Sequence, residues 1–143
     1  MSGNISEIGR PLVAKVGTVS STEMVSGTID AALYDEVQFC LYLGNMAAET
    51  IDFRIEECTA SDGTGAQSLL AATQLAAHAS NNDDKHIVLA VRTTKVSSGF
   101  RYLRGRAVTG NTTGGAAAIV GRGLPRYAPI SAPAACAETK FSV

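Results

Sequence analysis

Residues Glu36-Val-Gln-Phe-Cys-Leu-Tyr-Leu43 decide the fold class. Every second residue of this stretch is large and apolar, and these side chains share one face of an extended chain: Val37, Phe39, Leu41 and Leu43. The residues between them take the other face: Glu36, Gln38, Cys40 and Tyr42. Such strict alternation is the pattern of a β-strand that is buried on one side. The stretch therefore predicts a strand of a sheet that covers a hydrophobic core.

The next stretch, Thr50–Cys58, repeats this pattern after a turn at Gly44 and Asn45. Its inward row is Ile51, Phe53 and Ile55, and its outward row is Asp52, Arg54 and Glu56. Two alternating stretches that follow each other across a short polar loop are typical of an antiparallel pair. We therefore expect the two strands to be hydrogen-bonded neighbours.

Further stretches read as strands, separated by polar turn residues: Pro11–Val19, Met24–Ile29, Lys85–Thr93, Phe100–Val108 and Ala116–Gly121. Gly110–Gly115 is expected to be a hairpin loop between the last two. Ala66–Ala79 fits a short helix by propensity and a strand by its place among strands, so both stay open. The order predicts an all-β domain over residues 11–123, an antiparallel β-sandwich or a small barrel, after a flexible N-terminus over residues 1–10.

The last twenty residues differ in composition from this domain. Pro125, Pro129 and Pro133 recur every four residues, which excludes a helix interior and a central strand. The same segment carries apolar and aromatic side chains that a solvated tail does not need. We therefore expect residues 124–143 to form an extended arm, which binds a partner through Leu124, Arg126, Tyr127, Ile130 and Phe141.

Charge and length narrow the class of protein. The chain has 143 residues, which predicts one domain, and its 12 basic and 13 acidic residues give a net charge of −1. This balance provides no field that would gather nucleic acid or an anionic membrane, so neither is expected as a partner. The first ten residues lack the basic start and apolar core of a signal peptide, which predicts a chain kept in a cytosol.

The three cysteines, Cys40, Cys58 and Cys136, match no zinc-binding spacing, and their odd number excludes a complete set of intrachain disulfides. Cys40 and Cys58 lie in expected strands and are typical of small buried thiols. Cys136 lies in the arm, which makes it the candidate for an intermolecular disulfide.

No constellation of catalytic residues stands out in the sequence. His78 and His86 have no cysteine or carboxylate at metal-ligand spacing, and no serine lies in a nucleophile elbow. Glu56 and Glu57 are adjacent, so their side chains point to opposite faces of a strand and cannot act as an acid/base pair. We therefore expect a protein that is not an enzyme and that needs no cofactor and no metal.

A basic group, Arg101, Arg104 and Arg106, is interleaved with Phe100 and Tyr102. In a strand, Arg104 and Arg106 share a face with Tyr102, whereas Arg101 points away. Three interpretations stay open: solvated or ion-paired strand faces, a contact between subunits, and binding of single-stranded nucleic acid. Ion pairing with Asp52, Glu56 or Glu57 is favoured, and Arg104 and Arg106 are kept as possible interface residues.

Several short motifs resemble those of small virion proteins of tailed bacteriophages and prophages. These motifs are Tyr34–Phe39, Ile51–Glu57, Phe100–Arg104 and Leu124–Ile130, and the resemblance covers roughly residues 30 to 131. The sequence departs from the family in its Ile-Glu-Glu-Cys at residues 55–58, where a Gln-Glu pair is usual, and in Cys136 beyond the usual end. In the family the middle segment is β-like, which favours a strand within residues 66–79.

The resemblance implies a head decoration or cement protein of the virion. Such a protein binds across neighbouring major capsid protein subunits at the capsid surface, after assembly in the host cytoplasm. It also implies a homo-oligomer, with a trimer as the natural expectation where three capsid subunits meet. A ring-forming head–tail connector or tail protein is the alternative, and a carbohydrate- or receptor-binding module is a further one. Truncation at Gly123 is expected to leave a folded domain that no longer binds the capsid.

Overall fold

The computed structural model describes residues 11–19, 23–46, 50–76, 82–110 and 115–125. Within these residues the chain forms nine strands and two short 3-10 turns. They follow in the order β1 (Pro11–Val19), β2 (Met24–Val25), β3 (Ile29–Asp30), η1 (Ala31–Leu33), β4 (Tyr34–Leu43), β5 (Ile51–Cys58), β6 (Gln67–Ala71), β7 (His86–Arg92), η2 (Thr93–Lys95), β8 (Tyr102–Thr109) and β9 (Gly115–Pro125).

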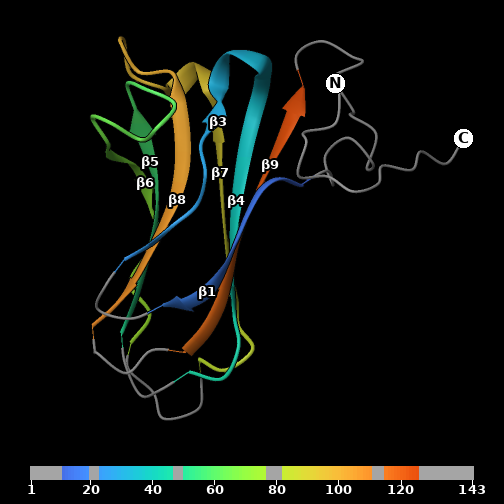
Figure 1. The fold of residues 1–143 in the computed structure, drawn as a ribbon, viewed down its shortest axis with the longest axis vertical. Coiled ribbons are helices and arrows are strands. Elements are labelled where there is room, and N and C mark those ends of the chain that lie inside the picture. Colours follow the sequence, from blue (N-terminus) through green and yellow to red (C-terminus); the bar gives the residue numbers. More distant parts are fainter. Residues whose placement is uncertain (1–10, 20–22, 47–49, 77–81, 111–114, 126–143) are drawn as a thin grey trace, which may run out of the picture.

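Two antiparallel sheets face each other and form a β-sandwich (Figure 1). The four-stranded sheet has the order β1-β9-β4-β7. The five-stranded sheet has the order β2-β8-β5-β6, and the short β3 also pairs with β8. Among the described strands neither sheet closes into a barrel, so the sandwich is confirmed as the architecture.

The core lies between the two sheets, where the expected inward rows of β4 and β5 meet. The exposed fraction is at most 2% for Val37, Phe39, Leu41, Ile51, Phe53 and Ile55. Leu103 of β8 and Ile119 of β9 are also fully buried and complete the layer. Full burial of one such side chain contributes about 1.5–3 kcal/mol, so these rows account for much of the stability of the domain.

Two glycines give the ring of Phe39 its space in this core. A Cβ atom at Gly121 of β9 would lie 2.7 Å from Phe39 Cε1, and one at Gly105 of β8 would lie 2.8 Å from Ile119 Cγ2. Both distances are shorter than real Cβ contacts, so a larger residue at either position would force the neighbouring core side chains to shift.

The expected pairing of β4 with β5 is wrong. β4 pairs with β7 and β9, whereas β5 pairs with β6 and β8 in the other sheet. The Gly44 N–H still binds Ala116 O in the four-stranded sheet, and the chain then crosses to the five-stranded sheet. A hairpin would have put both inward rows side by side on one face, whereas the crossing lets each row cover the other.

The loop from Gly110 to Gly115 is likewise not a hairpin. It joins β8 of the five-stranded sheet to β9 of the four-stranded sheet. The same physical reason applies, because Leu103 and Ala107 of β8 face Ile119 of β9 across the core. Short glycine-rich loops between alternating strands therefore do not distinguish a hairpin from a crossing between layers.

The open choice for residues 66–79 resolves to a strand over Gln67–Ala71. This strand, β6, pairs with β5 through Glu57 opposite Gln67 and Ile55 opposite Leu70. Leu75 then forms an isolated bridge with Ile51. Hydrogen bonds to the edge of β5 outweigh the helix propensity of the alanines and leucines. Residues 77–79 lie outside the described residues.

The remaining boundaries follow the expectations closely. β1 has the expected bounds, and the stretch Met24–Ile29 contains β2 and the first residue of β3. The exception is β9, which runs four residues past the predicted end at Gly121: Leu124 and Pro125, which were expected in the arm, pair with Glu36 and Tyr34 of β4. Residues 1–10 lie outside the described residues, as do Arg126, Tyr127, Ile130, Cys136 and Phe141, so the expectations placed on them stay predictions. The described residues include no helix long and apolar enough to cross a membrane.

Candidate functional site

The outer face of the five-stranded sheet carries a network of arginines around one buried carboxylate. Glu56 of β5 lies opposite Arg104 of β8, and its side chain is only 3% exposed. Arg54 Nε and Nη2 donate to Glu56 Oε1 at 2.9 and 2.5 Å. Arg104 donates to Glu56 Oε2 at 2.8 Å. The expectation that Glu56 faces water is therefore wrong, because two guanidinium groups cover it.

Arg106 of β8 extends this network to Glu23, the residue before β2. Its Nε donates to Glu23 Oε2, and it lies 3.9 Å from Glu56 Oε1. The hydrogen bond from Arg106 holds the pKa of Glu23 below its usual value. Arg104 and Arg106 thus share a face, as expected, and both are ion-paired within the chain. Their role at a subunit interface stays a prediction.

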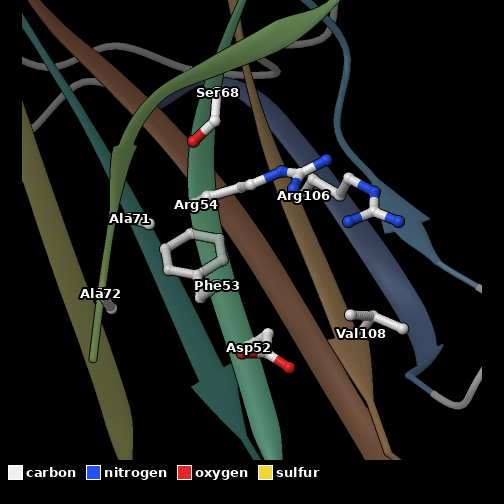
Figure 2. Close-up of a pocket in the computed structure, with 8 residues that line it drawn as sticks. All are labelled: Asp52, Phe53, Arg54, Ser68, Ala71, Ala72, Arg106 and Val108. Atoms are coloured by element: carbon white, nitrogen blue, oxygen red, sulfur yellow. The ribbon is translucent and has the colours of Figure 1, made fainter. Parts of the chain in front are cut away.

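A hollow of about 240 Å³ lies beside the network, over β5, β6 and β8. Figure 2 shows Arg54 and Arg106 reaching over it from neighbouring strands, with Asp52 at the other end of the view. Asp52 Oδ2 accepts a hydrogen bond of 2.8 Å from Gln74. The carboxylates of Glu23, Glu56 and Asp52 balance the three arginines around this hollow, so it has no excess charge that would attract an anion.

Glu57 lies on the opposite side of β5 from this network, as expected for adjacent residues in a strand. It is 1% exposed and accepts hydrogen bonds from the Ser97 N–H at 2.8 Å and from Gln67 Nε2 at 2.5 Å. Burial by itself would raise the pKa of Glu57, but the hydrogen bonds from Ser97 and Gln67 lower it below its ordinary value. Glu57 therefore ties the loop after η2 to β5 and β6, which is a structural role.

The outer face of the four-stranded sheet has a different character. The pairing register places Val16, Ala118, Tyr42 and His86 in one row across the sheet, and Ala14, Val120, Cys40 and Val88 in the next. We call Ala14, Val16, Cys40, Tyr42, Val88, Ala118 and Val120 the apolar band. Val16 is 78% exposed, Val88 47% and Tyr42 40%. Strands exposed on one side usually alternate apolar with polar residues, so a band without charge across all four strands is a candidate interaction surface.

Charged and polar residues follow the apolar band at the end where β9 finishes. Arg122 of β9 lies opposite Gln38 of β4, and Leu124 lies opposite Glu36 in the next row. Arg92 of the edge strand β7 also pairs with Glu36. This end is the one at which β9 finishes, at Pro125.

The described residues do not bring together a metal or catalytic site. They contain no group of three or more His, Cys, Asp or Glu side chains that could hold a metal ion. Cys40 and Cys58 are free and buried, and burial raises the pKa of the Cys58 thiol, which makes it a weaker nucleophile. His86 is exposed, with its ring 6.1 Å from that of Tyr42, and His78 lies outside the described residues.

Sequence reasoning missed the apolar band. It placed Cys40 and Tyr42 on the outward side of their strand, but it did not combine them with the outward residues of the other strands. The signal was present as small or apolar residues at the outward positions of three more strands, Ala14 and Val16, Val88 and Ala90, and Ala118 and Val120. Only the pairing register shows that these positions are adjacent.

Comparisons with known proteins give little guidance. No family model and no curated protein matches the chain. Among solved structures, the chain is similar to one from the infectious bursal disease virus Gx strain, with 9% identity and a TM-score of 0.37 over 82% of this chain and 31% of that chain. A chain from the Gt strain gives 13% identity and a TM-score of 0.34 over 77% of this chain and 30% of that chain. A mutant VP2 protein of the same virus, in derived T=1 particles, gives 13% identity and a TM-score of 0.34 over 77% of this chain. The chain spans about a third of the length of these proteins, and TM-scores this low leave the function to be argued from the chain's own residues.

Proposed function

We propose that this chain is a non-enzymatic structural protein of a virus particle, and more specifically a capsid decoration or cement protein of a tailed bacteriophage. The observation that carries the first part of the proposal, a structural protein that works in an assembly, is the apolar band. A sandwich with a complete core gains nothing by placing two rows of uncharged side chains across four strands on the water side, so we infer that this part of the face is covered in an assembly. The motif resemblance to small virion proteins of tailed phages supplies the kind of assembly.

In this role the sandwich is the rigid body and residues 126–143 make the contact with the capsid. Tyr127, Ile130 and Phe141 are the anchors, because aromatic and large apolar side chains supply most of the energy at interfaces. Each contact is weak by itself. Many copies, each bridging two major capsid protein subunits on the same lattice, add up to a shell that resists internal pressure.

The test is cosedimentation of the full-length protein with capsids that lack it. Saturable binding at a copy number that matches the capsid lattice supports decoration. Failure to bind overturns it, and a self-assembled ring in the same preparation identifies a head–tail connector instead.

A second variant tests the anchors. Tyr127→Ala, Ile130→Ala and Phe141→Ala together should remove about 3 kcal/mol of binding energy, which weakens capsid affinity about 100-fold. Leu33→Ala is the matched control, because Leu33 is an exposed apolar residue of η1 outside both the arm and the apolar band. Unchanged affinity in the triple variant would show that the arm does not bind the capsid.

A further inference from the structure

We propose that the apolar band is covered by a second copy of this chain, in a face-to-face dimer of the two four-stranded sheets. The inference goes beyond the proposed function and does not rest on it. The register of the sheet, the size of the face and the placement of its charges each support it.

The pairing register supports the dimer because it places large side chains opposite small ones. A two-fold axis parallel to the strands, passing between β9 and β4, places β9 of one copy over β4 of the other and β1 over β7. Each row then faces the same row of the second copy. Tyr42 lies against Ala118 and Val88 lies against Ala14, so a large side chain meets a small one at both places. Close-packed interfaces need such matching.

The size of the face is that of a stable interface. Strands lie about 4.8 Å apart and rise about 3.4 Å per residue, so four strands of seven to eleven residues present about 600 Å² of flat surface. Two such faces bury about 1,200 Å² together, which is at the lower end of the range for specific protein–protein interfaces. A partner that covered only one edge of the band would bury much less.

The charges favour this axis over one that runs across the strands. With the axis along the strands, Gln38 faces Arg122 of the second copy, and Glu36 lies one row from that same guanidinium. The contact occurs twice by symmetry, while Arg92 stays at the exposed edge strand. An axis across the strands would instead place Arg122 over Ala116 and its neighbour Thr18, which offer the guanidinium no charged partner.

The dimer has a consequence for the C-terminal segments. Because the strands of both copies run parallel to the axis, both β9 strands end at Pro125 on the same side of the dimer. Residues 126–143 of both copies therefore begin at the same end of the dimer. Two arms that begin close together raise the effective concentration of the second arm once the first is bound.

Sedimentation equilibrium of the full-length protein over a wide concentration range tests the stoichiometry. The expected result is a reversible monomer–dimer equilibrium. Val88→Lys should weaken it at least tenfold, because the ammonium group would be buried against the second copy. Leu33→Lys is the matched control: Leu33 is 46% exposed and Val88 47%, but Leu33 lies outside the band. A monomer at all concentrations, a trimer, or a dimer that Val88→Lys leaves intact would overturn the proposal.

A disulfide test fixes the orientation. In a Cys40→Ala, Cys136→Ser background, which removes the thiol that pairs with position 88 in the same sheet, Ala14→Cys with Val88→Cys should give covalently linked dimers on oxidation. The two positions lie on opposite edges of the sheet, about 14 Å apart, so they cannot form a disulfide within one chain. The pair Leu33→Cys with Val88→Cys is the control and should stay monomeric under denaturing conditions. Equal yields from both pairs would overturn the two-fold arrangement.

These outcomes separate the dimer from the proposed function. A monomer that still binds capsids would overturn the dimer and leave the decoration role intact. A dimer that does not bind capsids would overturn the decoration role and leave the dimer intact.

Discussion

The two outer faces of this sandwich are built from the same strand pattern and lead to opposite outcomes. On the five-stranded sheet, the outward residues Arg54, Glu56, Arg104 and Arg106 are charged and bind one another. On the four-stranded sheet, the outward residues of the apolar band carry no charge, and Val16 is 78% exposed. The charges of the first face are paired with one another or with water, whereas covering the second face removes apolar surface from water and is favourable. The difference assigns stability to one face and assembly to the other.

The largest expected effect comes from breaking the charged face at its centre. Glu56→Gln should lower the free energy of unfolding by about 3 kcal/mol, because it removes a buried carboxylate and leaves the largely buried Arg104 and the half-exposed Arg54 without their charged partner. Chemical denaturation measures this loss. The Val88→Lys background keeps the protein monomeric during the measurement.

Asp52→Asn is the matched control for that change. Asp52 lies on the same strand and the same face, but its side chain is exposed and its partner is the neutral amide of Gln74. The expected loss is at most about 0.5 kcal/mol, as for other exposed polar contacts. Equal losses from the two variants would show that the arginine network contributes no more than ordinary surface charge.

Acid should destabilise the domain through the loss of the Glu57 carboxylate in the five-stranded sheet. The pKa of Glu57 is lowered in the folded state, so its contribution to stability is present above the pKa of an unfolded glutamate, about 4.3. That contribution is lost as the pH falls through the lower, folded pKa. The melting temperature should fall between pH 6 and pH 3, and it should fall less in Glu57→Gln than in the unmodified chain. At pH 6 the variant should already be less stable by about 1 kcal/mol, or about 4 °C, because it has lost the charge-assisted hydrogen bonds. An identical pH profile in the variant would exclude Glu57 as the source.

The sequence was sufficient to locate the strands but not to predict which strands pair with each other. Alternation located β4, β5, β7 and β8 within two residues, because apolar side chains at every second position have only one way to leave water together. It could not tell that β4 and β5 lie in different sheets, since a hairpin and a crossing bury the same side chains. The assumption that consecutive strands pair was therefore the step that failed.

The candidate surfaces show the same limit. The sequence correctly placed Arg104 and Arg106 on one face and named Glu56 among the acidic residues that could pair with them. It gave no sign that Glu56 is buried, because that depends on Arg54 and Arg104 folding over it from two strands. The apolar band depends even more on register, since its residues come from four strands that lie far apart in the chain.

The smallest expected effect is a difference in the response of the two faces to salt. Sodium chloride should lower the free energy of unfolding of the Val88→Lys monomer by less than about 0.5 kcal/mol, because Glu56 is shielded from the solvent and the exposed pair of Arg101 with Asp30 contributes little. Sulfate should tighten the dimer of the unmodified chain, because it favours the burial of apolar surface. Chemical denaturation of the monomer with and without sodium chloride measures the first effect. Sedimentation equilibrium of the unmodified chain in the two salts at equal ionic strength measures the second. If chloride and sulfate changed the dimer equally, its interface would be held by charges, and the apolar band would not be the surface that the second copy covers.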